Sequence, residues 1–377
     1  MIYLDNSSTT PLDSAVLDAM LPYLKDTFGN PASQHGAGRT AASAVLNARD
    51  KIARLIGCKS DEVFFTSGGT EAGNWALKGA CLAQSGRGRH MVVSAIEHPA
   101  LIESAKDMQK QGYSVTFINP DESGAVNPAD VERAIRSDTV FCAVMAANNE
   151  TGVIQPVEEI GKICRSNGVF FYCDCVQTAG ALPFPTRHCD ALGISPHKFY
   201  GPKGFGVLYI RNGAKINRLI SGGKQERGLR GGTTNVAGAV GCAAALENAV
   251  RDMQTNNKKI SALRDSFVKS VLDGIDGAHL NGCGEKLPAT ANISFDGCEG
   301  ENVLFLLDLK GIAVSTGSAC SAGAVTPSHV LTAMGLSDGR IKSAVRFTFG
   351  KYNSEEEVTT AVAELKQAVL KIRGITS

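Results

Sequence analysis

The chain has 377 residues, more than a single hydrophobic core usually supports, so we expect two domains. Its 38 basic and 37 acidic residues give a formal net charge of +1, and no block of like charges indicates direct binding to nucleic acid or to an anionic membrane. Residues 1–6 lack the features of a secretory signal, and the longest weakly polar stretch, 237–246, is too short to span a bilayer. We therefore expect a cytoplasmic protein with no membrane partner.

Short apolar runs alternate with helical patterns between about residues 60 and 210. Such runs are typical of strands that are buried on both faces, and together they predict an α/β domain with a mostly parallel seven-stranded sheet. The ligands of such sheets bind at the carboxyl ends of the strands, so the residues after each strand are the candidates for a site. The predicted strands are 63–66, 91–94, 115–118, 140–145, 169–175, 191–194 and 206–210.

After about residue 255 the pattern changes to that of a smaller α+β domain. A helix at 258–272 and a last helix at 355–372 flank the remaining predicted elements, which are strands at 291–295, 311–315 and 345–349 and a short helix at 328–334. We assign residues 15–255 to a large domain that binds a cofactor. Residues 1–14 and 256–377 form the small domain.

The eleven cysteines are expected to be mostly buried small hydrophobic residues, because a large cytoplasmic chain has little use for disulfides. A cluster in the sequence invites a metal-binding interpretation, but its spacing fits no zinc pattern. Cys173 and Cys175 also lie in an apolar run, where they would share one face of a strand. We predict no metal site for this cluster, which comprises Cys164, Cys173, Cys175, His188 and Cys189.

Lys198 follows the apolar run 191–194 in the segment SPHKFYGPKG, residues 195–204. An amine held in such a turn can form a Schiff base with a carbonyl, most often that of pyridoxal 5'-phosphate (PLP). An ordinary surface lysine in a hairpin loop is the alternative that Lys198 alone does not exclude.

Two further turns follow predicted strands. Residues 66–71, TSGGTE, open a helix whose first N–H groups and dipole suit a phosphate, although a simple glycine turn would also explain them. His98 precedes Pro99, which favours a helix start, so the imidazole would either cap that helix or stack on a cofactor and transfer protons.

Three residues are unusual in their surroundings. Asp174 ends an apolar strand, where its carboxylate would either pair with the pyridine nitrogen of PLP or cap the next helix, with Gln177 nearby. Cys320 lies among ten consecutive small residues, 315–324, which suggests an exposed thiol on a hinged loop, either a travelling nucleophile or a cysteine of no consequence. Arg346 lies in an apolar strand and is either a core residue or a clamp for a substrate carboxylate.

Taken together, these motifs resemble the cysteine desulfurases of the NifS/IscS type, which belong to the class V aminotransferase family of fold type I PLP-dependent transferases. The resemblance covers the chain essentially from end to end. Its segments are YLDNSSTTP (3–11), FGNPASQH (28–35), TSGGTE (66–71), EH (97–98), NNETG (148–152), DCVQ (174–177), SPHKFYGPKG (195–204), QERGLRGGT (225–233) and the Ser-Ala-Cys sequence at 318–320.

The resemblance implies an activity and a role for each matching residue. The enzyme would remove sulfur from L-cysteine, giving L-alanine and a persulfide on Cys320, with Lys198 and His98 as the other catalytic residues. Arg346 and Asn149 would bind the substrate, and Cys320 could also bind an iron–sulfur cluster transiently, with no resident metal. The cofactor-binding residues would be Gly69, Thr70, His98, Asn149, Asp174, Gln177, Ser195, His197 and Lys198, together with Thr233 from the partner subunit of a homodimer.

The expected partners are L-cysteine and a sulfur acceptor, either an iron–sulfur scaffold or a tRNA-thiolation protein. Gly69, Pro196 and Gly231 differ from the residues usual in the family, and no long tail follows Arg346, which puts scaffold docking in doubt. A selenocysteine lyase or another PLP enzyme of the same fold is the alternative activity. A protein that keeps the fold without the chemistry is a further alternative, which the presence of Lys198, Asp174, His98 and Cys320 disfavours.

Overall fold

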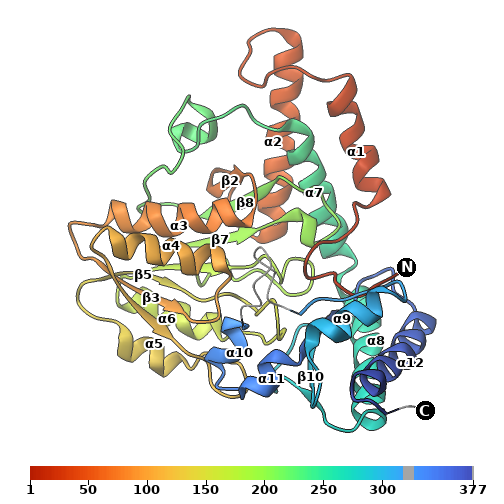
Figure 1. The fold of residues 1–377 in the computed structure, drawn as a ribbon. Coiled ribbons are helices and arrows are strands. Elements are labelled where there is room, and N and C mark those ends of the chain that lie inside the picture. Colours follow the sequence, from red (N-terminus) through yellow and green to blue (C-terminus); the bar gives the residue numbers. More distant parts are fainter. Residues whose placement is uncertain (317–326, 376–377) are drawn as a thin grey trace.

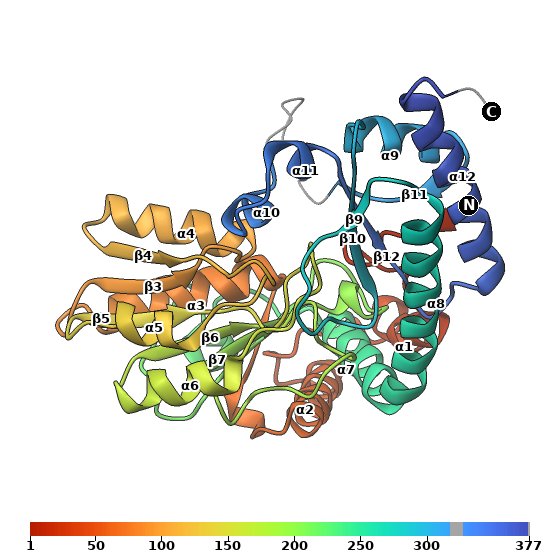
Figure 2. The same cartoon turned by 90° about the horizontal axis from the view of Figure 1, so that it is seen from below.

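The computed structural model describes residues 1–316 and 327–375 (Figure 1). Cys320 lies outside these residues. The chain folds into a large sheet covered by helices on both faces and a second, smaller layered unit beside it (Figure 2).

The large sheet has seven strands in the order β2-β8-β7-β6-β5-β3-β4. Neighbours from β7 to β4 are parallel, whereas β8 is antiparallel to both β2 and β7. The mostly parallel seven-stranded sheet predicted from the sequence is therefore confirmed. The strands are β2 (Val63–Thr66), β3 (His90–Ser94), β4 (Ser114–Ile118), β5 (Thr139–Ala143), β6 (Phe170–Asp174), β7 (Ala191–Ile194) and β8 (Gly206–Ile210).

Two hydrophobic clusters cover the faces of this sheet. Along β6 the side chains alternate, so that Phe170 and Tyr172 join one cluster while Phe171 and Cys173 join the other. Helices α3 (Gly69–Ala83) and α4 (Pro99–Lys110) lie over the first face (Figure 1). The helices on the opposite side are α2 (Gly36–Ile56), α5 (Pro128–Ala134), α6 (Val157–Ser166) and α7 (Val236–Arg251), with α1 (Ser14–Lys25) packed on α7.

The smaller unit is built on an antiparallel sheet in the order β12-β10-β9 and a parallel pair, β1 with β11. Its strands are β1 (Ile2–Tyr3), β9 (Ala278–Leu280), β10 (Thr290–Phe295), β11 (Ile312–Ala313) and β12 (Ala344–Thr348). Its helices are α8 (Met253–Gly274), α9 (Gly300–Asp308) and α12 (Glu355–Ile372). The short helices α10 (His329–Ala333) and α11 (Asp338–Lys342) lie between β11 and β12 in the chain and contribute Val330, Leu331 and Ile341 to a core cluster of the large sheet. A separate core holds this unit together, with Phe267, Phe295 and Phe347 fully buried in it.

All strands and helices that the sequence predicts with residue bounds are present, but the extents of some differ. The strand predicted at 311–315 is confined to Ile312–Ala313, and the strand predicted at 140–145 ends at Ala143. Elements β1, β9, α9 and α11 were not predicted; β1, β9 and α11 are too short to carry a readable periodicity.

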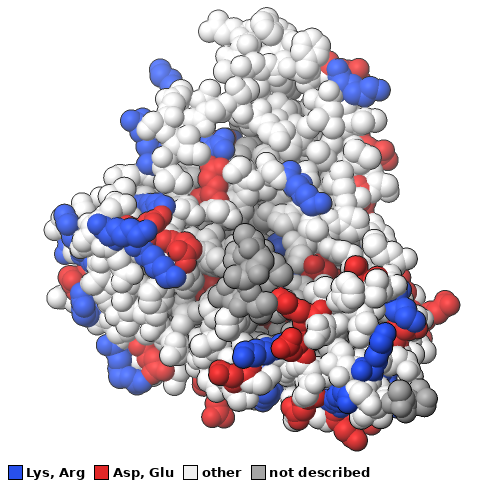
Figure 3. Space-filling model, viewed as in Figure 1, with Lys and Arg blue, Asp and Glu red and all other residues white. Residues whose placement is uncertain are grey.

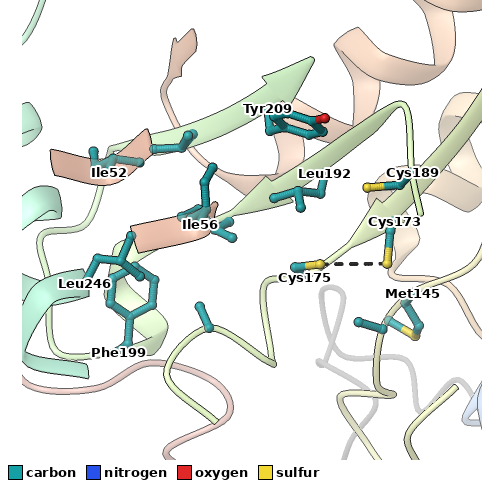
Figure 4. Packing of buried hydrophobic residues seen from close by; sticks show 14 of the residues in the cluster. Ile52, Ile56, Met145, Cys173, Cys175, Cys189, Leu192, Phe199, Tyr209 and Leu246 are labelled. Atoms are coloured by element: carbon teal, nitrogen blue, oxygen red, sulfur yellow. Dashed lines mark hydrogen bonds between the residues drawn. The ribbon is translucent and has the colours of Figure 1, made fainter. Parts of the chain in front are cut away.

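The clustered cysteines pack as the hydrophobic residues that the sequence predicts. Cys173, Cys175 and Cys189 lie in the core beside Leu192 and Tyr209, and Cys175 Sγ is 3.7 Å from Cys173 Sγ (Figure 4). In residues 1–316 and 327–375, no group of three or more His, Cys, Asp or Glu side chains is arranged to hold a metal ion. No helix in these same ranges is long and apolar enough to cross a membrane.

Candidate active site

Lys198 lies at the end of a short 3-10 helix, Pro196–Lys198, that follows β7. Its Nζ donates hydrogen bonds to the carbonyl oxygens of Ser7 at 2.5 Å and Ser8 at 2.9 Å. Burial, reinforced by the nearby positive charge of Arg346, lowers the pKa of this amine to about 8. At pH 7 about a tenth of Lys198 is therefore neutral, and so nucleophilic, a far larger share than for a lysine with the ordinary pKa.

Asp174 ends β6, the neighbour of β7 in the sheet, and is buried. Its Oδ1 accepts a hydrogen bond of 2.9 Å from the backbone N–H of Val176. Burial raises the pKa of the carboxyl to about 6, and the positive charge of Lys198 opposes that shift. A cation placed against this carboxylate would offset the cost of burying it.

His98 is the N-cap of α4, and its Nδ1 accepts a hydrogen bond from the N–H of Ala100 at 3.1 Å. This bond places the proton of the neutral ring on Nε2. Partial desolvation of the ring and the charge of Lys198 lower the pKa of His98 to about 4, so the ring is neutral at physiological pH. His98 thus caps α4, which was one of the two alternatives from the sequence, and its ring also lines the pocket.

One pocket, with a volume of ≈ 180 Å³, brings these three residues together at the carboxyl edge of the sheet. Met145 and Val176 line it and were not predicted as site residues: Met145 is the last residue of the predicted strand 140–145, and Val176 directly follows the predicted strand 169–175. The full lining is Gly69, Thr70, His98, Met145, Asn149, Asp174, Val176, Gln177, Ser195, His197 and Lys198.

One end of this pocket is formed by the first turn of α3, which begins at Gly69 and carries Thr70. The first N–H groups of a helix have no partner within the helix, and they lie at the positive end of its dipole. His197 also lines this pocket and is held by Thr9, with Nδ1 and Oγ1 3.2 Å apart. This end of the pocket therefore suits an anion such as a phosphate.

Arg346 comes from β12 in the smaller unit, and its side chain is 5% exposed. Its Nη1 donates to the carbonyl oxygen of Asn149, a pocket residue, at 2.9 Å. Its Nη2 donates to Asp5 Oδ1 at 2.8 Å and to Ser8 Oγ at 2.7 Å. The arginine thus lies beside the pocket and not in its lining.

One predicted residue lies elsewhere in the described part of the chain. Thr233 lines a different pocket of the chain, with Ser67, Gly204 and Arg230. Cys320 lies outside the described residues. Gln177 lines the site, and its Nε2 donates to the carbonyl oxygen of Ser7 at 3.1 Å, the same oxygen that accepts from Lys198.

The residues present fit PLP. Lys198 offers an amine for the aldehyde, the buried Asp174 carboxylate offers a partner for a protonated ring nitrogen, and the first turn of α3 suits the phosphate. The neutral His98 ring lines the same pocket and provides a surface on which a planar cofactor could stack.

Comparison with known proteins agrees with this geometry. The family described as Aminotransferase class-V matches residues 2–360. Cysteine desulfurase IscS of Dictyoglomus turgidum (strain DSM 6724 / Z-1310) is 44% identical, with 100% of this chain and 96% of that protein aligned.

Solved structures are also similar. A NifS-like protein superposes with a TM-score of 0.91 at 38% identity, covering 97% of this chain and 98% of its own. The structure of SspA in complex with cysteine superposes with a TM-score of 0.83 at 32% identity, covering 94% of this chain and 100% of SspA. The chain belongs to the class V aminotransferase family of PLP-dependent, fold type I enzymes, in its NifS/IscS-type branch.

Proposed function

We propose that this protein is a cysteine desulfurase that converts L-cysteine to L-alanine and leaves the sulfur as a persulfide on Cys320. The observation that carries the proposal is the single pocket in which Lys198, Asp174 and His98 meet, with Arg346 beside it. The similarity to a cysteine desulfurase that aligns with the whole of this chain, and to SspA, which was solved in complex with cysteine, supports this substrate.

Bound PLP supplies a carbonyl that condenses with amines and a ring that stabilises negative charge at the substrate Cα. Lys198 is the residue that would hold the cofactor through Nζ. Once its amine is free, the lowered pKa of about 8 suits it to remove the Cα proton as a general base.

Asp174 and His98 support this chemistry in different ways. The Asp174 carboxylate would keep a proton on the ring nitrogen by pairing with that cation. His98 carries its proton on Nε2, because Nδ1 is engaged with Ala100, and Nε2 is the atom that can exchange a proton with the substrate thiol.

Cys320 is assigned from the sequence. Its thiolate would attack the substrate sulfur, so that an S–S bond forms, the substrate C–S bond breaks, and the bonding pair passes to the substrate carbon. The carbon then takes up protons and leaves as L-alanine. We propose that the persulfide sulfur passes to an acceptor protein, either an iron–sulfur scaffold or a tRNA-thiolation protein.

We also propose a homodimer in which Thr233 completes the phosphate site of the partner subunit. Large apolar side chains are exposed on α1, in the loop that follows it and on α2, and Phe28 in this loop is 83% exposed. The others are Leu17, Leu21, Leu24 and Leu46. The end of the molecule at the loop between α1 and α2 shows few charged side chains (Figure 3). Light scattering on the purified protein tests this assembly.

We retain the domain division at residues 15–255 and 1–14 plus 256–377 as part of the proposal. The core that contains Leu4, Phe267 and Phe347 draws only on the second of these sets. Limited proteolysis, followed by mass analysis of the fragments, tests the boundary near residue 255.

The experiment for the function measures L-alanine and sulfide released from L-cysteine with a thiol reductant. The wild-type protein should form both, Lys198→Ala neither, and Cys320→Ser should keep its yellow cofactor while losing turnover. Full activity in Cys320→Ser would contradict the persulfide step and indicate a lyase or transaminase. A matched assay with L-selenocysteine tests the alternative selenocysteine lyase, which Cys320→Ser would leave active.

A further inference from the structure

The side chain of Arg346 is bound by the N-terminal segment of the chain. Its Nη2 donates to Asp5 Oδ1 at 2.8 Å and to Ser8 Oγ at 2.7 Å, and Ser8 Oγ in turn donates to Asp5 Oδ1 at 2.8 Å. The remaining contact, from Nη1, goes to the carbonyl oxygen of Asn149. The three side chains Asp5, Ser8 and Arg346 form one closed triangle of hydrogen bonds.

The stereochemistry of the guanidinium group limits how a carboxylate can join this triangle. A carboxylate binds arginine with two hydrogen bonds either end-on, through Nη1 and Nη2, or side-on, through Nε and Nη2. Both arrangements need a hydrogen of Nη2. In the structure both hydrogens of Nη2 are already donated, one to Asp5 and one to Ser8.

We propose that Asp5, supported by Ser8, is a positioning residue that competes with the substrate carboxylate for Arg346. A ligand with an α-carboxylate displaces Asp5 or Ser8 from Nη2 and forms two bonds of its own. An amine without a carboxylate leaves the triangle closed. The proposal rests on the proposed function for the identity of the ligand, L-cysteine, and for the product, L-alanine, which carries the same carboxylate.

This competition has a consequence for turnover. Asp5 lowers the affinity of Arg346 for every α-carboxylate, including that of the product, so it favours release of L-alanine. It also keeps the buried Arg346 charge paired when the site is empty, which avoids the cost of an isolated charge at a side chain only 5% exposed.

The test is the affinity of the PLP-loaded protein for L-alanine, followed by the change in cofactor absorbance and by calorimetry, without turnover. Asp5→Asn should tighten L-alanine binding by roughly three- to tenfold, because Arg346 is released from a charged competitor. Ser8→Ala should shift the affinity in the same direction by a smaller factor. Ethylamine, which is L-alanine without its carboxylate, should bind all of these proteins equally.

Asp13→Asn is the matched control, because Asp13 lies in the same segment but its carboxylate pairs with Lys351 and Tyr352. Its L-alanine affinity should equal that of the wild type. In a protein that also carries Arg346→Gln, Asp5→Asn should not tighten the binding of L-alanine. If Asp5→Asn folds and binds L-alanine no better than the wild type, or more weakly, Asp5 only orients Arg346 and the competition is refuted.

Ser8→Ala keeps the test valid if Asp5→Asn fails to fold, since unchanged or weaker L-alanine binding by Ser8→Ala refutes the proposal equally. The outcome is also separate from that of the proposed function. A wild-type protein that releases no alanine from L-cysteine would refute the desulfurase activity, whereas tighter L-alanine binding by Asp5→Asn would still establish the competition at Arg346.

Discussion

Arg49 and Glu226 form a buried ion pair with two parallel hydrogen bonds, Nη1 to Oε2 and Nη2 to Oε1, each 2.7 Å long. The two side chains are only 9% and 4% exposed. Glu226 also accepts a hydrogen bond from the backbone N–H of Phe65 in β2. Both Glu226 and Arg227 have the left-handed backbone that non-glycine residues rarely adopt, so this pair holds a strained segment against the sheet.

Replacing Glu226 by Gln should therefore destabilise the fold by about 3–5 kcal/mol, because Arg49 would remain charged and buried without its partner. Chemical denaturation of the protein measures this loss. Glu247→Gln is the control, since Glu247 pairs with Lys51 at the surface and its loss should cost at most about 1 kcal/mol. Equal effects of the two substitutions would mean that the buried pair contributes no more than an exposed one.

The lowered pKa of Lys198 should determine how the rate of PLP incorporation into the apoprotein depends on pH. Only the neutral amine condenses with the aldehyde of PLP, and the pKa of about 8 lies well below the ordinary lysine value of 10.5. The rate at which the apoprotein gains the Schiff-base absorbance should rise with pH and be half-maximal near pH 8. A half-maximal rate near pH 10 would show that burial and Arg346 do not depress this pKa. Lys198→Ala provides the baseline without the absorbance band.

Asp174 should make the apoprotein less stable as the pH rises. Its folded pKa of about 6 is above its ordinary value of 3.8, so its contribution to stability is fully present below pH 3.8 and is lost as the pH rises through 6. Asp174→Asn removes this loss. Between pH 4 and pH 8, the free energy of unfolding of the apo variant should rise by up to roughly 3 kcal/mol relative to that of the wild-type apoprotein.

The same substitution should weaken PLP binding, because an amide cannot pair with a protonated ring nitrogen. Apoprotein denaturation at the two pH values and PLP titration provide the two measurements. A variant that loses stability at pH 8 would show instead that the Asp174 carboxylate is favourably paired without the cofactor.

Arg346→Lys should raise the KM for L-cysteine on the order of a hundredfold, because a lysine cannot bind a carboxylate with two parallel hydrogen bonds. The cofactor absorbance should stay unchanged, since Arg346 does not line the cofactor pocket. Arg340→Lys is the control: Arg340 binds Leu280 and Asn281 in the smaller unit, so its loss should lower the melting temperature without changing the KM. An unchanged KM in Arg346→Lys would contradict the assignment of the substrate carboxylate to this residue.

The large sheet could be predicted because its strands are buried on both faces and therefore consist of continuous apolar runs. The turns after those runs could be predicted as site residues because parallel strands bring their carboxyl ends to one edge. Lys198, Asp174 and His98 lie at or just after the carboxyl ends of three different strands and meet in one pocket for this reason. Met145 was read as part of a strand that ends at Ala143, because hydrophobicity alone does not distinguish a buried strand residue from a residue lining a pocket.

The family, the cofactor chemistry and the side chains available at the edge of the sheet could be derived from the sequence, since these depend on local motifs and on the period of buried strands. Which atoms oppose each other across the chain depends instead on the tertiary packing. Asp5 meets Arg346 and Ser7 meets Lys198 because the smaller unit and the N-terminal segment pack against the sheet, and no local pattern encodes a contact between segments so far apart. The same packing sets the burial that lowers the pKa of Lys198 and raises that of Asp174, because desolvation is a property of the folded surroundings and not of the residue.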